Sequence, residues 1–235
     1  MPSKLEAKVN KKGYRKGPYF IGFPSAAQDT GRGREAGGCT NTVTDADRLP
    51  FDCKVLVSMF NSTHTLVGLA LARTGMDRWS RHAAWTAVIA SNLPDIDIVA
   101  GLYDTPAYIE YHRGITHSIA GIPLLSIALA AAMYRFSGNF LKTTVIALLA
   151  TSSHLLLDYL NTYGIRPFLP FDGTWFYGDA LFIIDPLFDA VLIAMLAAGH
   201  FLPAHGRRLA VIGLAVVTLY VGLRLELRNL SRSYI

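Results

Sequence analysis

The sequence has little charge and almost no cysteine. Asp, Glu, Lys and Arg make up 17% of its 235 residues, against roughly 25% in an ordinary soluble domain. A coiled coil needs more charge than this, and a disordered chain needs a hydrophobic content lower than the 51% found here. The two cysteines, Cys39 and Cys53, form no C-x-x-C pair, which argues against a thiolate metal site or a redox motif.

The charge is unevenly distributed along the chain. Residues 1–58 hold 16 charged side chains, about 28% of the segment, whereas residues 59–235 hold 23, about 13%. The first segment has no helical or strand period and is predicted to be a disordered basic extension. Because the composition changes abruptly, we expect Met59 to be the native start. The positive charge lies mostly in this extension, so no nucleic-acid partner is expected.

Long uncharged segments fill residues 59–235, the predicted membrane domain. Residues 114–134 include 21 consecutive positions without Asp, Glu, Lys or Arg, and a spanning helix needs about 17–25 apolar residues. The predicted fold class is therefore all-α, a polytopic membrane bundle of five to six helices within the lipid bilayer. The expected helices are 60–73, 80–96, 115–135, 140–160, 182–202 and 207–226. The alternative is a soluble all-α protein, but these segments leave too little polar surface for it.

Ionisable residues interrupt the apolar segments in five short clusters, and such residues are costly in lipid and usually functional. If the chain crosses the membrane alternately, all five clusters lie at the same face. The clusters contain His64; Asp95 and Asp97; His112, Arg113 and His117; His154 and Asp158, followed by Asn161; and Asp179 and Asp185.

The residue types in these clusters predict a metal site. His154 and Asp158 are four residues apart, so on a helix they project from one face, as paired zinc ligands do. The available ligands exceed the four of a closed structural zinc, which favours a catalytic or binuclear site. Single residues also have plainer explanations: His64 can be a core histidine, and Asp185 before Pro186 can be a helix N-cap.

Several short motifs in this order resemble the YdjM-like family, whose members are described as metal-dependent hydrolases of the inner membrane. The motifs are Asn61-Ser62-Thr63-His64-Thr65, Leu93-Pro94-Asp95-Ile96-Asp97, His112-Arg113-Gly114-Ile115-Thr116-His117, His154-Leu155-Leu156-Leu157-Asp158 and Ile184-Asp185-Pro186. The resemblance implies metal ligands at His64, Asp95, His112, His117, His154 and Asp158. It further implies catalytic roles for Asp97, Arg113 and Asn161, with Asp179 and Asp185 completing the site.

The expected function is a membrane-embedded hydrolase in which a metal-activated water attacks an ester or phosphoester. Asp97 or Asp158 would take the proton, and Arg113 would hold a phosphate. Imidazole and carboxylate ligands favour zinc, with manganese or iron as alternatives. A site at the lipid–water boundary suggests a lipid-like or lipid-linked substrate. The alternative function is a non-enzymatic metal or proton-coupled transporter that uses the same His/Asp cluster, although the sequence shows no internal repeat.

The basic residues predict an orientation. The loops opposite the clusters hold Arg73, Arg78, Arg81, Arg135, Lys142, Arg207 and Arg208, whereas the long loops on the cluster side hold Arg113 and Arg166. Because loops rich in Lys and Arg stay in the cytoplasm, we expect a multi-pass protein of the inner (plasma) membrane with its site on the outer face.

Overall fold

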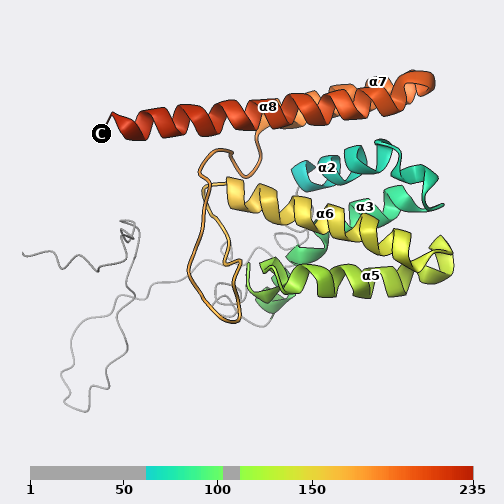
Figure 1. The fold of residues 1–235 in the computed structure, drawn as a ribbon, viewed down its shortest axis with the longest axis horizontal. Helices are drawn as coiled ribbons and strands as arrows, with labels where there is room; N and C mark the ends of the chain where they lie inside the picture. The colour runs from blue at the N-terminus through green and yellow to red at the C-terminus, as the bar shows by residue number, and fades with distance from the viewer. Residues whose placement is uncertain (1–61, 103–111, 235) are drawn as a thin grey trace, which may run out of the picture. The chain divides into compact units, whose positions relative to one another are not determined.

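The computed structural model describes residues 62–102 and 112–234. In these residues the chain forms six α-helices and no β-strand, which confirms the all-α prediction (Figure 1). The helices are α2 (Ser62–Arg73), α3 (Ala83–Asn92), α5 (Gly121–Ser137), α6 (Phe140–Leu160), α7 (Pro186–Phe201) and α8 (Gly206–Ser233). The predicted N-terminal extension and the expected start at Met59 lie outside the described residues.

Helices α3, α5 and α7 are shorter than the sequence predicted. The predicted segments that lie outside these helices contain several of the candidate site residues. After Asn92 the chain continues as the 3-10 helix η3 (Leu93–Leu102), because Pro94 has no backbone N–H to donate within an α-helix. Before α5 the chain forms a separate 3-10 turn, η4 (Ile115–His117). Helix α7 begins at Pro186 because Asp185 caps it, accepting a hydrogen bond from the Phe188 backbone N–H at 3.2 Å.

Sequential helices pair closely. Helices α5 and α6 are joined by Gly138 and Asn139: Gly138 ends α5 in the left-handed region at φ 70°, and Asn139 caps α6 by accepting from the Lys142 N–H at 3.0 Å. Helix α3 packs against both α2 and α6, and α7 packs against α8. The core between α2, α3 and α6 is built largely from small residues, which let helix backbones approach closely. They include Ala72, Ala83, Ala87, Ala90, Ala147 and Ala150.

Gly68 is the tightest point of the α2–α3 contact. A Cβ atom at Gly68 would lie 2.8 Å from the Ala87 carbonyl oxygen and would overlap the Ser91 hydroxyl. We therefore expect Gly68→Ala to destabilise the protein by about 1–3 kcal/mol through overpacking, measured by thermal unfolding in detergent. The control is Gly222→Ala on α8, where a Cβ would meet nothing within 4 Å. Equal melting temperatures for the two variants would contradict this packing.

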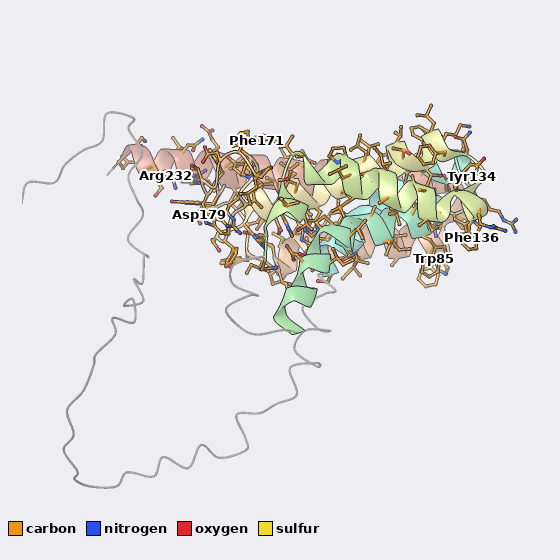
Figure 2. The ribbon with its side chains drawn as sticks, turned by 90° about the horizontal axis from the view of Figure 1, so that it is seen from below. Trp85, Tyr134, Phe136, Phe171, Asp179 and Arg232 are labelled. Atoms are coloured by element: carbon orange, nitrogen blue, oxygen red, sulfur yellow. The ribbon has the colours of Figure 1, made fainter. Side chains whose placement is uncertain are left out.

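Two helical segments are long and apolar enough to cross a membrane: α6 and the segment Pro203–Ser233, which joins the short 3-10 helix η5 (Pro203–His205) to α8. Helices α5 and α7 are apolar but shorter. Large apolar side chains on the helix surfaces are exposed, among them Leu124 on α5 at 66% and Leu141 on α6 at 73%, as expected for residues that face lipid. Figure 2 shows the exposed aromatic residues Trp85, Tyr134 and Phe136 together at one end of the helices.

Candidate metal centre

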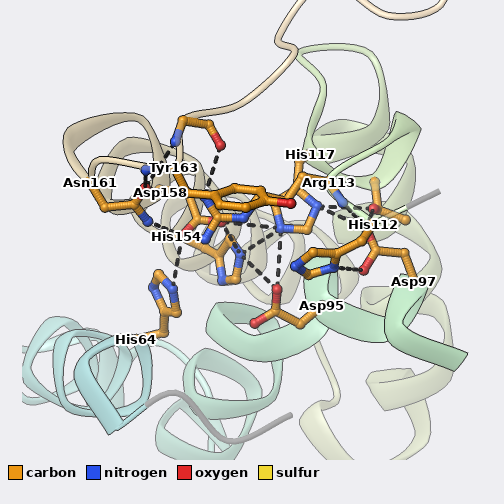
Figure 3. Close-up of polar contacts among 12 residues, drawn as sticks. His64, Asp95, Asp97, His112, Arg113, His117, His154, Asp158, Asn161 and Tyr163 are labelled. Carbon is orange, nitrogen blue, oxygen red and sulfur yellow. Dashed lines mark hydrogen bonds and ion pairs between the residues drawn. The ribbon is translucent and has the colours of Figure 1, made fainter. Parts of the chain in front are cut away.

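Four buried side chains from three segments converge on one point (Figure 3). Asp95 comes from η3, His117 from η4, and His154 and Asp158 from adjacent turns of α6. One potential ligand atom from each lies within 4.8 Å of all the others. The sequence prediction that His154 and Asp158 share one helix face is therefore confirmed: His154 Nε2 lies 3.3 Å from Asp158 Oδ2.

The spacing of these atoms suits a cation with four ligands. His117 Nε2 lies 3.0 Å from His154 Nε2, 3.3 Å from Asp95 Oδ1 and 3.3 Å from Asp158 Oδ2. His154 Nε2 lies 3.6 Å from Asp95 Oδ1. A tetrahedral ion with bonds of about 2.0–2.1 Å needs ligand atoms about 3.3 Å apart. The cluster can therefore hold a metal ion with little rearrangement.

The outer nitrogens of the two histidines explain why their inner nitrogens can be ligands. His154 Nδ1 lies 2.7 Å from the Ser91 carbonyl oxygen, and His117 Nδ1 lies 3.2 Å from Asp97 Oδ2. Both partners only accept, so when either ring is neutral its proton sits on Nδ1 and the lone pair of Nε2 points inward. Two lone pairs and two carboxylates then face one another, an arrangement that a divalent cation stabilises. Hydrogen bonds of this kind orient ligating histidines in metalloproteins.

Asp97 lies behind His117 and organises the loop before α5. Its carboxylate accepts hydrogen bonds from the Arg113 backbone N–H at 2.8 Å and the Thr116 hydroxyl at 2.8 Å, and His112 Nδ1 lies 3.1 Å from its Oδ1. Burial tends to raise the pKa of Asp97, but hydrogen bonds with His112 and His117 outweigh it and hold this pKa well below its usual range. Asp97 is therefore an anion that links the two histidines.

His117 carries the opposite shift. Burial lowers the pKa of its imidazole, but hydrogen bonds with Asp158, Asp95 and Asp97 outweigh burial and raise the pKa to about 10. The three carboxylates around the His117 ring make a positive charge at this position favourable. A proton on His117 or a metal ion in the cluster can supply this charge. The two compete for the same His117 nitrogen.

Arg113 and Asn161 hold Asp158 from the other side. The Arg113 guanidinium donates to Asp158 Oδ1 at 3.0 Å and to the Gly164 carbonyl at 2.8 Å, and its carbon lies 4.6 Å from the centre of the Tyr163 ring. Asn161 ends α6 and donates to Asp158 Oδ1 at 3.2 Å, while its own oxygen accepts from the Gly164 backbone N–H. These contacts favour a role in positioning Asp158; the catalytic roles implied by the family resemblance stay predictions.

Two of the six predicted ligands lie beside the four-residue cluster instead of within it. His64 stacks on His154 with ring centres 3.9 Å apart, and its Nε2 lies 3.4 Å from Asp158 Oδ1. His112 contacts Asp97 as described above. Their assignment as direct ligands therefore stays a prediction, although both lie close enough to shape the centre.

Asp179 and Asp185, predicted to complete the site, contact none of the four cluster residues. Asp179 is exposed, with φ of 51°. Asp185 is the helix N-cap considered above, and both of its oxygens accept from the Tyr220 hydroxyl at 3.2–3.3 Å. Asp185 does line a very small cavity, about 10 Å³, together with His64 and Asp158. It therefore lies next to the centre and joins α7 to α8.

Sequence reasoning missed three residues that support the centre. The Ser91 backbone carbonyl orients His154, and Thr116 holds Asp97. Asp189 is buried and accepts from the hydroxyls of Ser62 and Thr63 at 2.9 and 2.7 Å, which ties α7 to the start of α2 beside His64. A carboxylate in an apolar helix is a usable signal for Asp189, whereas a backbone carbonyl leaves no trace in a sequence.

Comparisons with known proteins agree with the predicted membrane character. Residues 59–230 match the family model described as YdjM inner membrane protein. The chain is also 33% identical over 173 residues to YfhP of Bacillus subtilis, described as an uncharacterized protein. That match covers 69% of this chain and 51% of YfhP, so the chain spans about half the length of this curated relative. No solved structure matches the chain. Because the family model covers most of the sequence, the chain belongs to the YdjM family of inner membrane proteins.

Proposed function

We propose that this membrane protein is a metal-dependent hydrolase with one divalent cation held by Asp95, His117, His154 and Asp158. The observation that carries the proposal is a buried convergence in which each of two imidazole nitrogens lies 3.0–3.6 Å from the other nitrogen and from one oxygen of each of two carboxylates. Two nitrogen and two oxygen ligands at tetrahedral spacing favour zinc over manganese or iron. When bound, such an ion would polarise an ester or phosphoester oxygen, and by expanding from four ligands to five it would take up a water and lower the pKa of that water to about 7.

Residues around the cluster have separate roles in proton transfer and in positioning the ligands. His112 is held by Asp97 through its Nδ1, as a catalytic histidine is oriented by a carboxylate, and it is partly exposed. We assign it the role of receiving and returning a proton, with Asp97 stabilising the charged ring. Arg113 offsets the charge of Asp158 and holds its carboxylate in place.

The position of the centre supports an amphiphilic substrate. His154 and Asp158 occupy the last two turns of α6, a candidate membrane span, which supports our proposal that the centre lies near the boundary between the hydrocarbon core and the headgroup region. An ester or phosphoester of a lipid-like molecule presents its polar bond at this depth. We further propose a multi-pass arrangement with the centre on the outer face, because Arg135 in the last turn of α5 and Lys142 in the first turn of α6 lie at the opposite end of this helix pair.

The test is hydrolysis by purified, metal-loaded protein in detergent, with aryl phosphodiesters, aryl carboxylic esters and phospholipids as substrates. We expect His112→Gln to retain the metal and to lower kcat by about 10²–10⁴, whereas His82→Gln, on the surface contact with the Phe136 carbonyl, leaves kcat unchanged. Metal flux into proteoliposomes without hydrolysis of any of these substrates would contradict the hydrolase and favour the transporter. A kcat of His112→Gln equal to that of the wild-type protein would contradict the role of His112 in proton transfer.

A further inference from the structure

A cavity of about 590 Å³ lies at the other end of α2 from the metal centre. It is bounded by the last residues of α2, the 3-10 helix η2 (Met76–Arg78), the end of α7 and the start of α8. A second cavity of about 320 Å³ adjoins it and shares Gly75, Arg78 and Arg207. His64 and Arg73 are separated by about 14 Å along the α2 axis, so this cavity is distinct from the metal centre.

Three arginines and one aspartate line the cavity, so its lining is positively charged. In residues 62–102 and 112–234, none of Arg73, Arg78 and Arg207 forms an ion pair. Asp77 is the acidic side chain in the lining, which leaves a surplus of two positive charges. Because the planar guanidinium group matches phosphate oxygens in pairs, this lining favours a phosphate-bearing anion.

The backbone is shaped to bring these groups together. Gly75 has φ of 126°, and a Cβ there would lie 3.2 Å from Arg207 Nε, so the glycine lets the guanidinium lie against the turn after α2. Helix α8 begins at Gly206 in the cavity wall and has no side-chain cap. The positive end of the α8 dipole adds to the attraction for an anion.

The cavity also lies at the depth where lipid headgroups are found. It opens at the start of the candidate span Pro203–Ser233, beside Trp79, which is 46% exposed. Trp85, Tyr134 and Phe136 are at the same end of the helices (Figure 2), and exposed aromatic residues mark membrane interfaces. Leu69 and Leu196 in the lining offer an apolar surface to the first carbons of an acyl chain.

We propose that this cavity binds the phosphate headgroup of an anionic phospholipid, at the membrane face opposite the metal centre. The guanidinium groups of Arg73, Arg78 and Arg207 bind the phosphate, and Leu69 and Leu196 contact the start of the acyl chains. The proposal is independent of the hydrolase function. Basic pockets between membrane helices recognise anionic headgroups in this way.

The test is binding of short-chain phosphatidylglycerol to the full-length protein in detergent, measured by native mass spectrometry and calorimetry. Short-chain phosphatidylcholine and glycerol phosphate are the comparison ligands. We expect Arg78→Gln with Arg207→Gln to weaken phosphatidylglycerol binding at least about tenfold. The matched control is Arg135→Gln with Lys142→Gln, which removes the same charge from exposed positions at the same end of the helices but outside the cavity, and should change binding less than about twofold.

Melting temperatures without lipid establish that each variant is folded, and Arg78→Gln alone provides a milder change. If both double variants weakened phosphatidylglycerol binding equally, the lipid would be attracted by the general surface charge, and the proposed binding site would be overturned. Equal binding of phosphatidylcholine would overturn the preference for an anionic lipid. Glycerol phosphate that binds as tightly as phosphatidylglycerol would overturn the lipid as the ligand.

Discussion

Replacing Asp158 with asparagine is expected to remove metal binding and to destabilise the protein at the same time. Asp158 Oδ2 faces both ligand histidines, and Oδ1 accepts from Arg113. Loss of a ligand should lower the metal affinity by at least about 100-fold, more than the loss of an outer partner. Because Arg113 is itself buried, an uncompensated guanidinium should cost about 3–5 kcal/mol in unfolding free energy.

Metal content by elemental mass spectrometry and thermal unfolding in detergent measure the two effects separately. The matched control is Asp172→Asn, which changes an exposed aspartate in the loop between α6 and α7 and should alter neither quantity. A second variant, Arg113→Met with Asp158→Asn, removes both charges and should recover part of the stability without recovering the metal. Wild-type metal content in Asp158→Asn would exclude Asp158 as a ligand.

Removal of the metal by a chelator is expected to lower the melting temperature of the wild-type protein by about 8–16 °C. A ligand present at 1,000 times its Kd stabilises the folded state by about 4 kcal/mol, and each kcal/mol shifts the melting temperature by about 2–4 °C in a chain of this size. The effect is large because the cation joins η3, η4 and α6 through four ligands at one buried point.

His117→Gln serves as the control for chelation. This variant lacks a ligand, so the chelator should leave its melting temperature nearly unchanged. Addition of zinc, manganese or iron(II) to the stripped wild-type protein then ranks the three ions by the melting temperature that each restores. No response of the wild-type protein to chelator or to any added ion would contradict the metal centre.

Much of the architecture could be predicted because it depends on local sequence. Uncharged segments mark the positions of the helices along the chain, and a proline or a capping residue decides where several of them begin or end. Asp185 before Pro186 shows this: the pair caps α7 in the structure, as the sequence allowed. The pair His154 and Asp158 was equally accessible, because four residues place two side chains on one helix face irrespective of the rest of the fold.

The choice among similar polar residues could not be predicted in the same way. His112 and His117 lie in one short motif, yet His117 belongs to the cluster of four and His112 contacts Asp97 behind it. The difference arises from Arg113, whose φ of 55° turns the chain between them and whose backbone N–H is held by Asp97. Such a turn depends on a contact sixteen residues away in the chain, which no local pattern records.

The sequence by itself determined that this chain is helical, membrane-embedded and equipped with histidines and carboxylates that can bind a metal, because apolar length and ligand chemistry are properties of short segments. Only the tertiary structure decided that Asp95, His117, His154 and Asp158 are the four that converge. It also decided that Arg73, Arg78 and Arg207 line one cavity at the opposite end. Both outcomes depend on how closely separate helices approach, which is set by packing at small residues such as Gly68.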